Sequence, residues 1–451
     1  MKQKETFLTS VCNLAIPVAL QSMLQSSFSI VDQIMIGQLG SVSVAGVGLA
    51  GKFPSIFSVM VSAIGAVAGI MISQYIGQKN KPEVRRSFYL NLILAIGLAT
   101  IFTAICGLFP KSIMSLYTRD TEMLLASADY LRIVAGTFLP MAGATLLSTM
   151  FRCMEMAKLP LYASMASALL NTILNYILIF GKFGITPLGA QGAAIATLIS
   201  QYINFLIMLF MICMHNDNLK LSQTIQKTLP KINWKQYWDM LLPILICEFM
   251  WSLGENVYAA IYGHLGTEAS AAMTLTNPVQ GLMIGALCGL SQAASVIIGK
   301  KLGNKEYDEA YTAAKKLILY GFVGSIALSV LIIISSRFYV EIYQVEESVK
   351  LLTRQILFAY ALVAPCKVQN MIVGGGIIRS GGKTKYVMVI DLIGTWVFGV
   401  PLGLFSAFVL NLSIPYVYFI LSLEECIRFG ISIVVLRKKK WMQSLEGGEI
   451  C

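Results

Sequence analysis

Four polar residues recur at helical spacing in an apolar stretch near the start of the chain. Between Leu14 and Gly40, at positions i, i+4, i+8 and i+11, a helix would place on one face Gln21, Gln25, Ser29 and Asp32. A carboxylate inside hydrocarbon is costly, so Asp32 should face protein or a water-filled cavity. We interpret Asp32 as a functional residue and Gln25 as a candidate substrate or charge-relay residue. The alternative is an acid that only reaches the membrane interface, which a short aspartate side chain fits less well.

A second pair of acids lies in a later apolar stretch, residues 236–263. Glu248 and Glu255 are seven residues apart and so share a helix face, which also carries Tyr258 and Tyr262. An acid flanked by aromatic rings suits a lipophilic cation, held by charge attraction and cation–π contact. We therefore interpret Glu255 and Tyr258 as candidate substrate contacts. The alternative is an aromatic belt at the membrane interface, which we expect for Tyr262.

Further charges lie in the last three apolar stretches. Lys367 and Asp391 are candidates for an ion pair between two helices. Its role is either structural or to break when a proton or a substrate arrives, and the sequence leaves both open. Glu424 and Arg428 are four residues apart and are spaced to neutralise each other on one helix.

Neutral polar residues follow the same pattern in the first half of the chain. Asn171 and Asn175 are four residues apart, and Thr197 lies in the next apolar stretch. These side chains are suited either to supply oxygens beside Asp32 or to form hydrogen bonds between helices, and spacing alone favours the second.

The composition is that of a polytopic membrane protein. Hydrophobic residues make up 56% of the chain and charged residues 13%, and the mean hydropathy is +0.72. The net charge of +11 comes from short loops, so it indicates topology rather than binding to nucleic acid. The nine cysteines show no paired spacing, and the two histidines fall outside the expected spans. No HExxH and no GxxxxGK[ST] motif is present, so we expect neither a metal-dependent membrane enzyme nor an ATP-driven pump, and no cofactor.

Hydropathy predicts twelve transmembrane helices. One set of alternate loops and ends carries 24 lysines and arginines and the other set carries 5, which places both termini in the cytoplasm of a bacterial inner membrane. The predicted spans are 11–37, 46–77, 87–110, 121–151, 159–181, 189–214, 236–263, 270–299, 310–335, 347–377, 385–410 and 415–436.

The chain consists of two copies of one module. An offset of 226 residues pairs Pro17 with Pro243 and Gly77 with Gly303, and many residues between them follow. Six spans per copy make the copies parallel, related by a pseudo-two-fold axis along the membrane normal. We therefore predict an N-terminal lobe at 1–214, a cytoplasmic linker at 215–233 and a C-terminal lobe at 234–451. Substrate sites in such proteins lie at or near the interface between the halves.

Six segments occur in order along nearly the whole chain: VDQIMIGQLG, QYIGQKNKPEVRR, NTILNYILIFG, PLGAQGAAIATLIS, IYGHLG and GGGIIRSGGKT. Together they resemble the motifs of the multidrug and toxic compound extrusion (MATE) transporters. The acid in the first helix is closer to the DinF-like and related bacterial branches.

The resemblance implies a V-shaped pair of lobes that export cationic, lipophilic compounds in exchange for H⁺ or Na⁺. It places a cation site at Asp32, Asn171 and Thr197, and Glu255 approximately matches an acid of the seventh helix. The family has an aspartate where this chain has Asn175. A site with one carboxylate binds a metal cation more weakly, so we favour H⁺ over Na⁺. We expect small cationic substrates and the lipid bilayer as partners, and a monomer.

The alternative within this architecture is a flippase for lipid-linked saccharides. Its phosphate-bearing cargo would want a basic cavity. The single charges deep in the apolar stretches comprise one basic residue, Lys367, and the acids Asp32, Glu248, Glu255 and Asp391. We therefore expect an acidic cavity.

Overall fold

The protein is built entirely from helices in the part of the chain that a computed structural model describes, residues 7–39, 41–118, 120–184, 186–214, 233–343 and 345–445. This confirms the predicted all-α, multi-span membrane fold. Within those residues, eleven helices are long and apolar enough to cross a bilayer. They are Phe7–Gly37, Gly46–Gly77, Lys81–Leu108, Thr121–Cys153, Lys158–Phe180, Gly189–Met214, Trp234–His264, Thr267–Gly303, Tyr307–Glu341, Glu347–Ile378 and Thr384–Val409.

The twelfth predicted span, 415–436, is divided between two shorter helices. They are α16 (Ile414–Ser422) and α17 (Glu424–Arg437), and neither is long enough to cross a bilayer by itself. Leu423 separates them, although its φ of −61° and ψ of −18° stay close to helical values. The first turn of α17 contains two buried acids, Glu424 and Glu425, and a helix N-terminus favours negative charge. The break therefore creates a place for acids inside an apolar bundle.

The helices divide into two compact units. The N-terminal unit comprises Leu20–Ile72 and Lys79–Ile232, and the C-terminal unit comprises Met1–Ala19, Ser73–Gln78 and Asn233–Cys451, as far as these ranges are described. The division falls inside α1 (Phe7–Gly37) and α3 (Lys52–Gly77), so the beginning of α1 and the end of α3 pack with the C-terminal unit. The predicted linker lies outside the described residues, apart from Asn233.

The N-terminal unit is a bundle with an aromatic and small-residue core. Phe57 packs against Phe102 and Phe138, with ring centroids 5.3 and 4.6 Å away. Gly143 faces the Phe205 ring so closely that a Cβ there would overlap it. The elements that complete this bundle are α2 (Ser41–Ala50), α4 (Lys81–Leu108), α5 (Pro110–Met114), α6 (Thr121–Val134), η1 (Ala135–Thr137), α7 (Phe138–Cys153), α8 (Lys158–Phe180) and α9 (Gly189–Met214).

The C-terminal unit differs in that three of its segments are π-helical. They are η4 (Met371–Ile378), η5 (Ile393–Gly399) and η6 (Phe405–Val409). Such segments are rare and occur often at functional sites, because the wider turn re-aims the side chains around it. The α-helices of this unit are α10 (Trp234–His264), α11 (Thr267–Gly303), α12 (Tyr307–Glu341), α13 (Glu347–Asn370), α14 (Thr384–Leu392), α15 (Val400–Leu404), α16 and α17.

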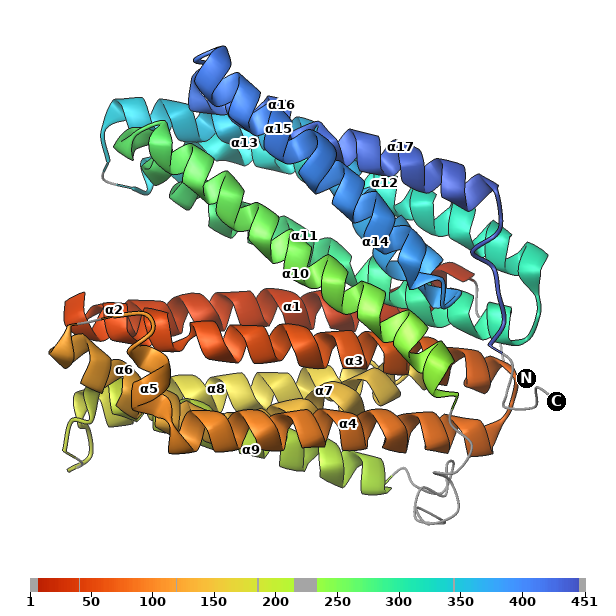
Figure 1. Ribbon diagram of the computed structural model, residues 1–451, viewed down its shortest axis with the longest axis horizontal. Helices are drawn as coiled ribbons and strands as arrows, with labels where there is room; N and C mark the ends of the chain where they lie inside the picture. The colour runs from red at the N-terminus through yellow and green to blue at the C-terminus, as the bar shows by residue number, and fades with distance from the viewer. Residues whose placement is uncertain are drawn as a thin grey trace. The chain divides into compact units, whose positions relative to one another are not determined.

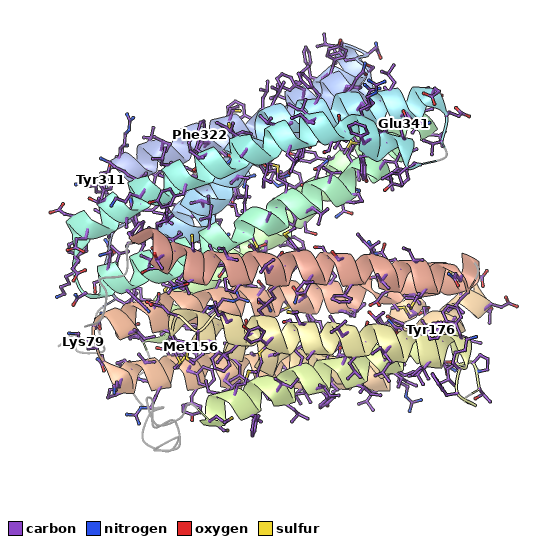
Figure 2. All side chains as sticks on the ribbon, turned by 180° about the vertical axis from the view of Figure 1, so that it is seen from behind. Lys79, Met156, Tyr176, Tyr311, Phe322 and Glu341 are labelled. Carbon is purple, nitrogen blue, oxygen red and sulfur yellow. The ribbon has the colours of Figure 1, made fainter. Side chains whose placement is uncertain are left out.

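Apolar side chains cover the outside of both units. In Figure 2, the labelled Phe322 of α12 and Tyr176 of α8 point away from their helices, and they are 42% and 48% exposed. A membrane protein needs such a surface, because lipid rather than water surrounds its helices.

The end of α3 crosses the end of α11 at very short range. A Cβ on Gly77 would overlap the backbone of Lys300, and a Cβ on Gly303 would overlap the backbone of Gln74. The offset of 226 exchanges these two contacts, so each copy of the module supplies the glycine that the other packs against. Small residues allow this close approach of helices in membranes.

The end of the described chain is fixed to the same part of α3. Gln74 donates from Nε2 to the carbonyl of Ser380 at 2.6 Å and accepts from the backbone N–H of Leu445 at 2.6 Å. Gln78 donates to the carbonyl of Leu445 at 2.7 Å, and the ring of Trp441 is fully buried. These contacts hold residues 441–445 against α3 within the C-terminal unit.

The glycine crossing gives a direct test of the fold. We expect Gly303→Ala to lower the free energy of unfolding by about 1–3 kcal/mol, because the new methyl group must displace backbone atoms. Gly97→Ala is the matched control, since a Cβ at Gly97 of α4 meets nothing within 4 Å. We expect it to be neutral or slightly stabilising. Thermal unfolding in detergent micelles measures both, and equal effects would contradict the close crossing.

Candidate functional site

Asp32 lies in a hydrogen-bonded cluster of the N-terminal unit. Asn175 of α8 donates from Nδ2 to Asp32 Oδ1 at 2.6 Å and also to Asn171 Oδ1 at 3.1 Å. Asn171 is 3.5 Å from Thr197 Oγ1 of α9. The structure therefore brings together the four residues expected at the cation site. Interhelical hydrogen bonding and contact with Asp32 are both present, so the two readings of the asparagines do not exclude each other.

The Asn171 amide is the pivot of this cluster. The atom that faces Asp32 lies 3.0 Å from Oδ1 and 3.1 Å from Oδ2 of the carboxyl group. This atom is the Asn171 amide oxygen, so an ionised Asp32 would set two acceptors against each other. Rotation of the amide by half a turn would turn the Asn171 nitrogen toward Asp32 instead. Both asparagines are buried, whereas Asp32 is half-buried. The protonation state of one carboxyl group is therefore tied to the orientation of a buried amide.

The polar face of α1 is only partly engaged. Gln21 is buried and donates to Ser164 Oγ of α8 at 2.8 Å. Gln25 and Ser29 are exposed, and no contact joins Gln25 to Asp32. The role of Gln25 as a substrate contact stays a prediction.

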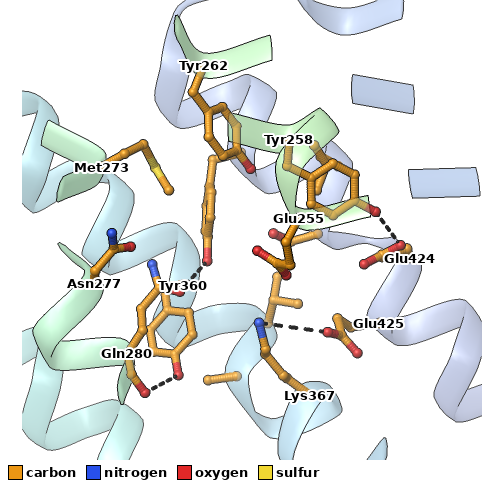
Figure 3. A pocket seen from close by; sticks show the side chains of 15 residues that line it. Glu255, Tyr258, Tyr262, Met273, Asn277, Gln280, Tyr360, Lys367, Glu424 and Glu425 are labelled. Carbon is orange, nitrogen blue, oxygen red and sulfur yellow. Dashed lines mark hydrogen bonds and ion pairs between the residues drawn. The ribbon is translucent and has the colours of Figure 1, made fainter. Parts of the chain in front are cut away.

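A cavity lies inside the C-terminal unit between α10, α11, α13, α16 and α17 (Figure 3). Its volume, taken as the space open to the centre of a water molecule, is about 70 Å³. A water molecule needs about 10–15 Å³ of such space, so the cavity can hold a few waters or a small cationic group. Its polar and aromatic lining consists of Glu255, Tyr258, Tyr262, Asn277, Gln280, Tyr360, Lys367, Tyr418, Ser422, Glu424 and Glu425.

Two of the three glutamates of the cavity have partners. Tyr258 donates to Glu424 Oε2 at 2.7 Å, and both side chains are buried. Gly399 of η5 makes this pair possible, since a Cβ there would overlap both. Glu255 is exposed at the rim and makes no hydrogen bond or ion pair with a described residue. The cavity thus offers one carboxylate to an incoming group.

Glu425 is buried at the centre of a chain of charges whose other members are partly buried. Lys367 Nζ lies 4.0 Å from Glu425 Oε1, and Arg428 Nη1 lies 3.4 Å from Glu425 Oε2. Asn370 donates to Glu425 Oε2 at 2.8 Å. Arg428 also pairs with Asp391 of α14, whose carboxylate accepts from two of its nitrogens. Alternating charges therefore run from Lys367 to Asp391 through the unit.

Two of the predicted ion pairs are wrong. Lys367 pairs with Glu425 rather than with Asp391, and Arg428 pairs with Glu425 and Asp391 rather than with Glu424. The reason lies in α17, where Glu425 and Arg428 are three residues apart and face Asp391, while Glu424 points to Tyr258. Tyr262 also differs from expectation: it is buried beside the cavity rather than in an interfacial belt.

The last predicted acid, Glu248, lies outside the cavity. Arg379 donates to Glu248 Oε1 at 3.4 Å and lies 3.5 Å from the sulfur of Cys247. Cys247 in turn donates to Asp391 Oδ2 at 2.7 Å. Glu248 is therefore joined to the end of the charge chain, in a structural contact.

Several cavity residues escaped the sequence analysis. Tyr360 lies seven residues before Lys367 and shares a face of α13 with it, and Tyr418 lies seven residues before Glu425, across the break between α16 and α17. That spacing was the available signal. Gln280 gave none, and it enters the cavity through its contact with the Tyr418 hydroxyl at 3.3 Å.

The described residues contain no group of three or more histidine, cysteine, aspartate or glutamate side chains placed to hold a metal ion. At Asp32 a Na⁺ ion would find one carboxylate and the neutral oxygens of Asn171 and Thr197, whereas Asn175 presents its amide nitrogen there. Oxygen ligands of this kind suit hard cations.

The chain is similar to known transporters along its length. A model of the MatE family matches residues 17–177 and 243–405. The two matches begin at Pro17 and Pro243, which the offset of 226 pairs, and this confirms the two-copy organisation. The chain is 22% identical to "Uncharacterized transporter YisQ" of Bacillus subtilis, covering 96% of this chain and 95% of that protein. It is 24% identical to "Probable multidrug resistance protein NorM" of Thermotoga maritima, with 95% and 92% covered.

The fold is also similar to solved structures. One is described as the "Outward-facing conformation of a multidrug resistance MATE family transporter of the MOP superfamily". It matches with a TM-score of 0.85 at 18% identity and covers 97% of both chains. This likeness shows a common fold.

The charge chain predicts a large cost for removing its central cation. We expect Arg428→Met to lower the free energy of unfolding by about 3–5 kcal/mol, because Asp391 and Glu425 would stay buried without it. Lys385→Met is the control, since Lys385 pairs with Asp239 at 3.0 Å on the surface. We expect it to cost less than about 1 kcal/mol. If both variants unfold in detergent at the same temperature as the native protein, the chain of charges contributes nothing to stability.

Proposed function

We propose that this protein is an antiporter, which exports lipophilic organic cations in exchange for protons. The premise is that the chain belongs to the MatE family. The coupling site is Asp32 with Asn171, Asn175 and Thr197, and the substrate meets Glu255 and Tyr258. The observation that carries the proposal is the hydrogen bonding of Asp32, which is complete when its carboxyl group holds a proton. The acid in α1 supports a place in the DinF-like or a related bacterial branch.

Protonated Asp32 gives its own two oxygens and the Asn171 oxygen matching partners, while Asn175 Oδ1 stays buried without a hydrogen-bond partner among the described residues. The Asp32 O–H donates to Asn171 Oδ1 across the 3.1 Å from Oδ2, while Asp32 Oδ1 accepts from Asn175. Asn171 Oδ1 also accepts from Asn175, which leaves the Asn171 nitrogen pointing to Thr197. One proton therefore matches Asp32 to Asn171 and Asn175 with the amides as they stand.

Ionised Asp32 breaks this arrangement. The carboxylate accepts only, so the Asn171 amide must turn its nitrogen toward it. That nitrogen then lies 3.1 Å from Asn175 Nδ2, which is also a donor. Two donors facing each other cost free energy, so the side chains, or the helices that carry them, must move apart. Loss of the proton thus favours a different packing of α1 against α8.

This difference supplies a coupling step. Two conformations are exchanged by a ligand only if it binds them with different free energies. The proton stabilises the packing described above, and an organic cation stabilises the ionised site or the carboxylate of Glu255. The antiport follows when one occupant excludes the other. We further propose that the protein lies in the bacterial inner membrane as a monomer with cytoplasmic termini, on the strength of its basic loops.

Transport in proteoliposomes tests the coupling. We expect a pH gradient, but not a Na⁺ gradient, to drive ethidium transport by the native protein. Asp32→Asn should reduce it to the level of empty liposomes, because an amide cannot take up and release the proton. Asp129→Asn is the matched control, as Asp129 is exposed in the same unit and contacts Gln191. Proton-driven transport that survives in Asp32→Asn would move the coupling site to the C-terminal unit.

A second variant tests why protons are favoured. Asn175→Asp adds a carboxylate 2.6 Å from Asp32, where two acids can share one Na⁺ ion. We expect a Na⁺ gradient to drive ethidium transport in this variant, and the pH gradient to become less effective. Asn171→Ser, which removes an amide without adding charge, should gain no Na⁺ dependence. Identical ion dependence in Asn175→Asp and native protein would refute the single-carboxylate argument.

A further inference from the structure

We propose that Lys367 is a charge filter, which restricts the C-terminal cavity to a substrate group with one positive charge. The inference rests on the proposed function, because it takes the cavity as the place where a substrate cation meets Glu255. It goes beyond that function by giving the selectivity to one residue. Lys367 belongs neither to the Asp32 cluster nor to the direct contacts assigned to the substrate.

The partners of the three glutamates determine how much charge the cavity can receive. Glu424 accepts from Tyr258, and Glu425 faces Arg428, Asn370 and Lys367. Among the described lining residues, Glu255 is the carboxylate left without a partner. Glu424 is buried behind its hydrogen bond with the neutral Tyr258 hydroxyl, so Glu255 is the carboxylate of this lining that an incoming positive charge can contact directly.

Lys367 is itself a cation at the cavity wall. Figure 3 shows its ammonium group pointing into the same space as Glu255, with Glu425 beside it. Its side chain is 30% exposed, whereas that of Glu425 is 9% exposed, so the lysine is the more accessible of the two to an incoming group. A second positive charge would therefore meet the ammonium group before it could reach Glu425.

The ammonium group is also held in place. Glu425 cannot turn away from Lys367 freely, because Asn370 donates both to its carboxylate and to its backbone carbonyl, at 2.8 and 2.7 Å. Arg428 holds the other side of the same carboxylate. A fixed charge in a partly desolvated site repels a like charge more strongly than it would in water.

The aromatic lining fits this role. The rings of Tyr258, Tyr262, Tyr360 and Tyr418 surround a space of about 70 Å³, enough for a small cationic head group while the apolar body stays outside. Aromatic rings bind such cations without adding negative charge. They increase affinity for an organic cation but leave the number of accepted charges to Glu255 and Lys367.

Two dyes with one chromophore test the filter. Ethidium carries one positive charge, and propidium carries a second on a quaternary ammonium arm. Binding is measured by fluorescence in detergent, with Asp32→Asn as background so that the N-terminal carboxylate does not contribute. With Lys367 in place, we expect ethidium to bind more tightly than propidium. Lys367→Gln should raise propidium affinity relative to ethidium about tenfold, by removing one unit charge at short range.

Three further variants fix the interpretation. Lys367→Arg keeps the charge and should keep the original preference, and Lys385→Gln removes a surface lysine and should change neither dye. Glu255→Gln should weaken both dyes, which tests the substrate site itself. An unchanged preference in Lys367→Gln, with ethidium binding still dependent on Glu255, overturns the filter and leaves the proposed function standing. Ethidium affinity that is unchanged in Glu255→Gln overturns the proposed substrate site, and the charge filter with it.

The test does not depend on Lys367→Gln folding. If Lys367→Gln does not fold, the charge filter is tested with the Asp32→Asn protein and its Lys367→Arg derivative. Both must bind ethidium more tightly than propidium, and tighter binding of propidium by either overturns the proposal.

Discussion

A carboxylate inside an apolar helix bundle must be neutralised, and the organisation of both units follows from this constraint. The N-terminal unit meets it at Asp32 with amide donors and, as we propose, with a proton. The C-terminal unit meets it with permanent cations, Lys367 and Arg428, which alternate with Glu425 and Asp391. One solution can be reversed by a proton, whereas the other is fixed by covalently attached charges.

This contrast gives the two copies of the module different tasks. In the mechanism that we propose, the hydrogen bonds of the cluster around Asp32 depend on one proton, so the cluster is suited to switching. The charge chain of the C-terminal unit is fully paired and costly to break, so it is suited to hold the cavity in shape. Among the described carboxylates that line the cavity, Glu255 at the rim stays open to an incoming cation. Duplication therefore preserved the scaffold, whereas the polar residues diverged within it.

The scaffold shows where the symmetry was kept. Gly77 and Gly303 occupy equivalent positions and make equivalent contacts, with Lys300 and Gln74. Backbone atoms meet backbone atoms there, and no side chain other than hydrogen fits between them. The π-helical segments η4, η5 and η6 lie in the C-terminal unit, beside its buried charges. They re-aim side chains around the cavity, for example by bringing Gly399 next to the Tyr258–Glu424 pair.

The sequence by itself determined the helical membrane fold and the two copies, and it singled out Asp32 as an acid inside an apolar stretch, on a polar helix face. Each depends on a periodic or additive property: hydropathy over about 20 residues, a constant offset, or a polar face at 100° per residue. Spacing also identified Asn171, Asn175 and Glu255. Only the tertiary structure decided the partners of Lys367 and Asp391, and the burial of Tyr262. Those contacts join helices far apart in the chain, and their choice depends on helix rotation and on the break at Leu423, which no local pattern specifies.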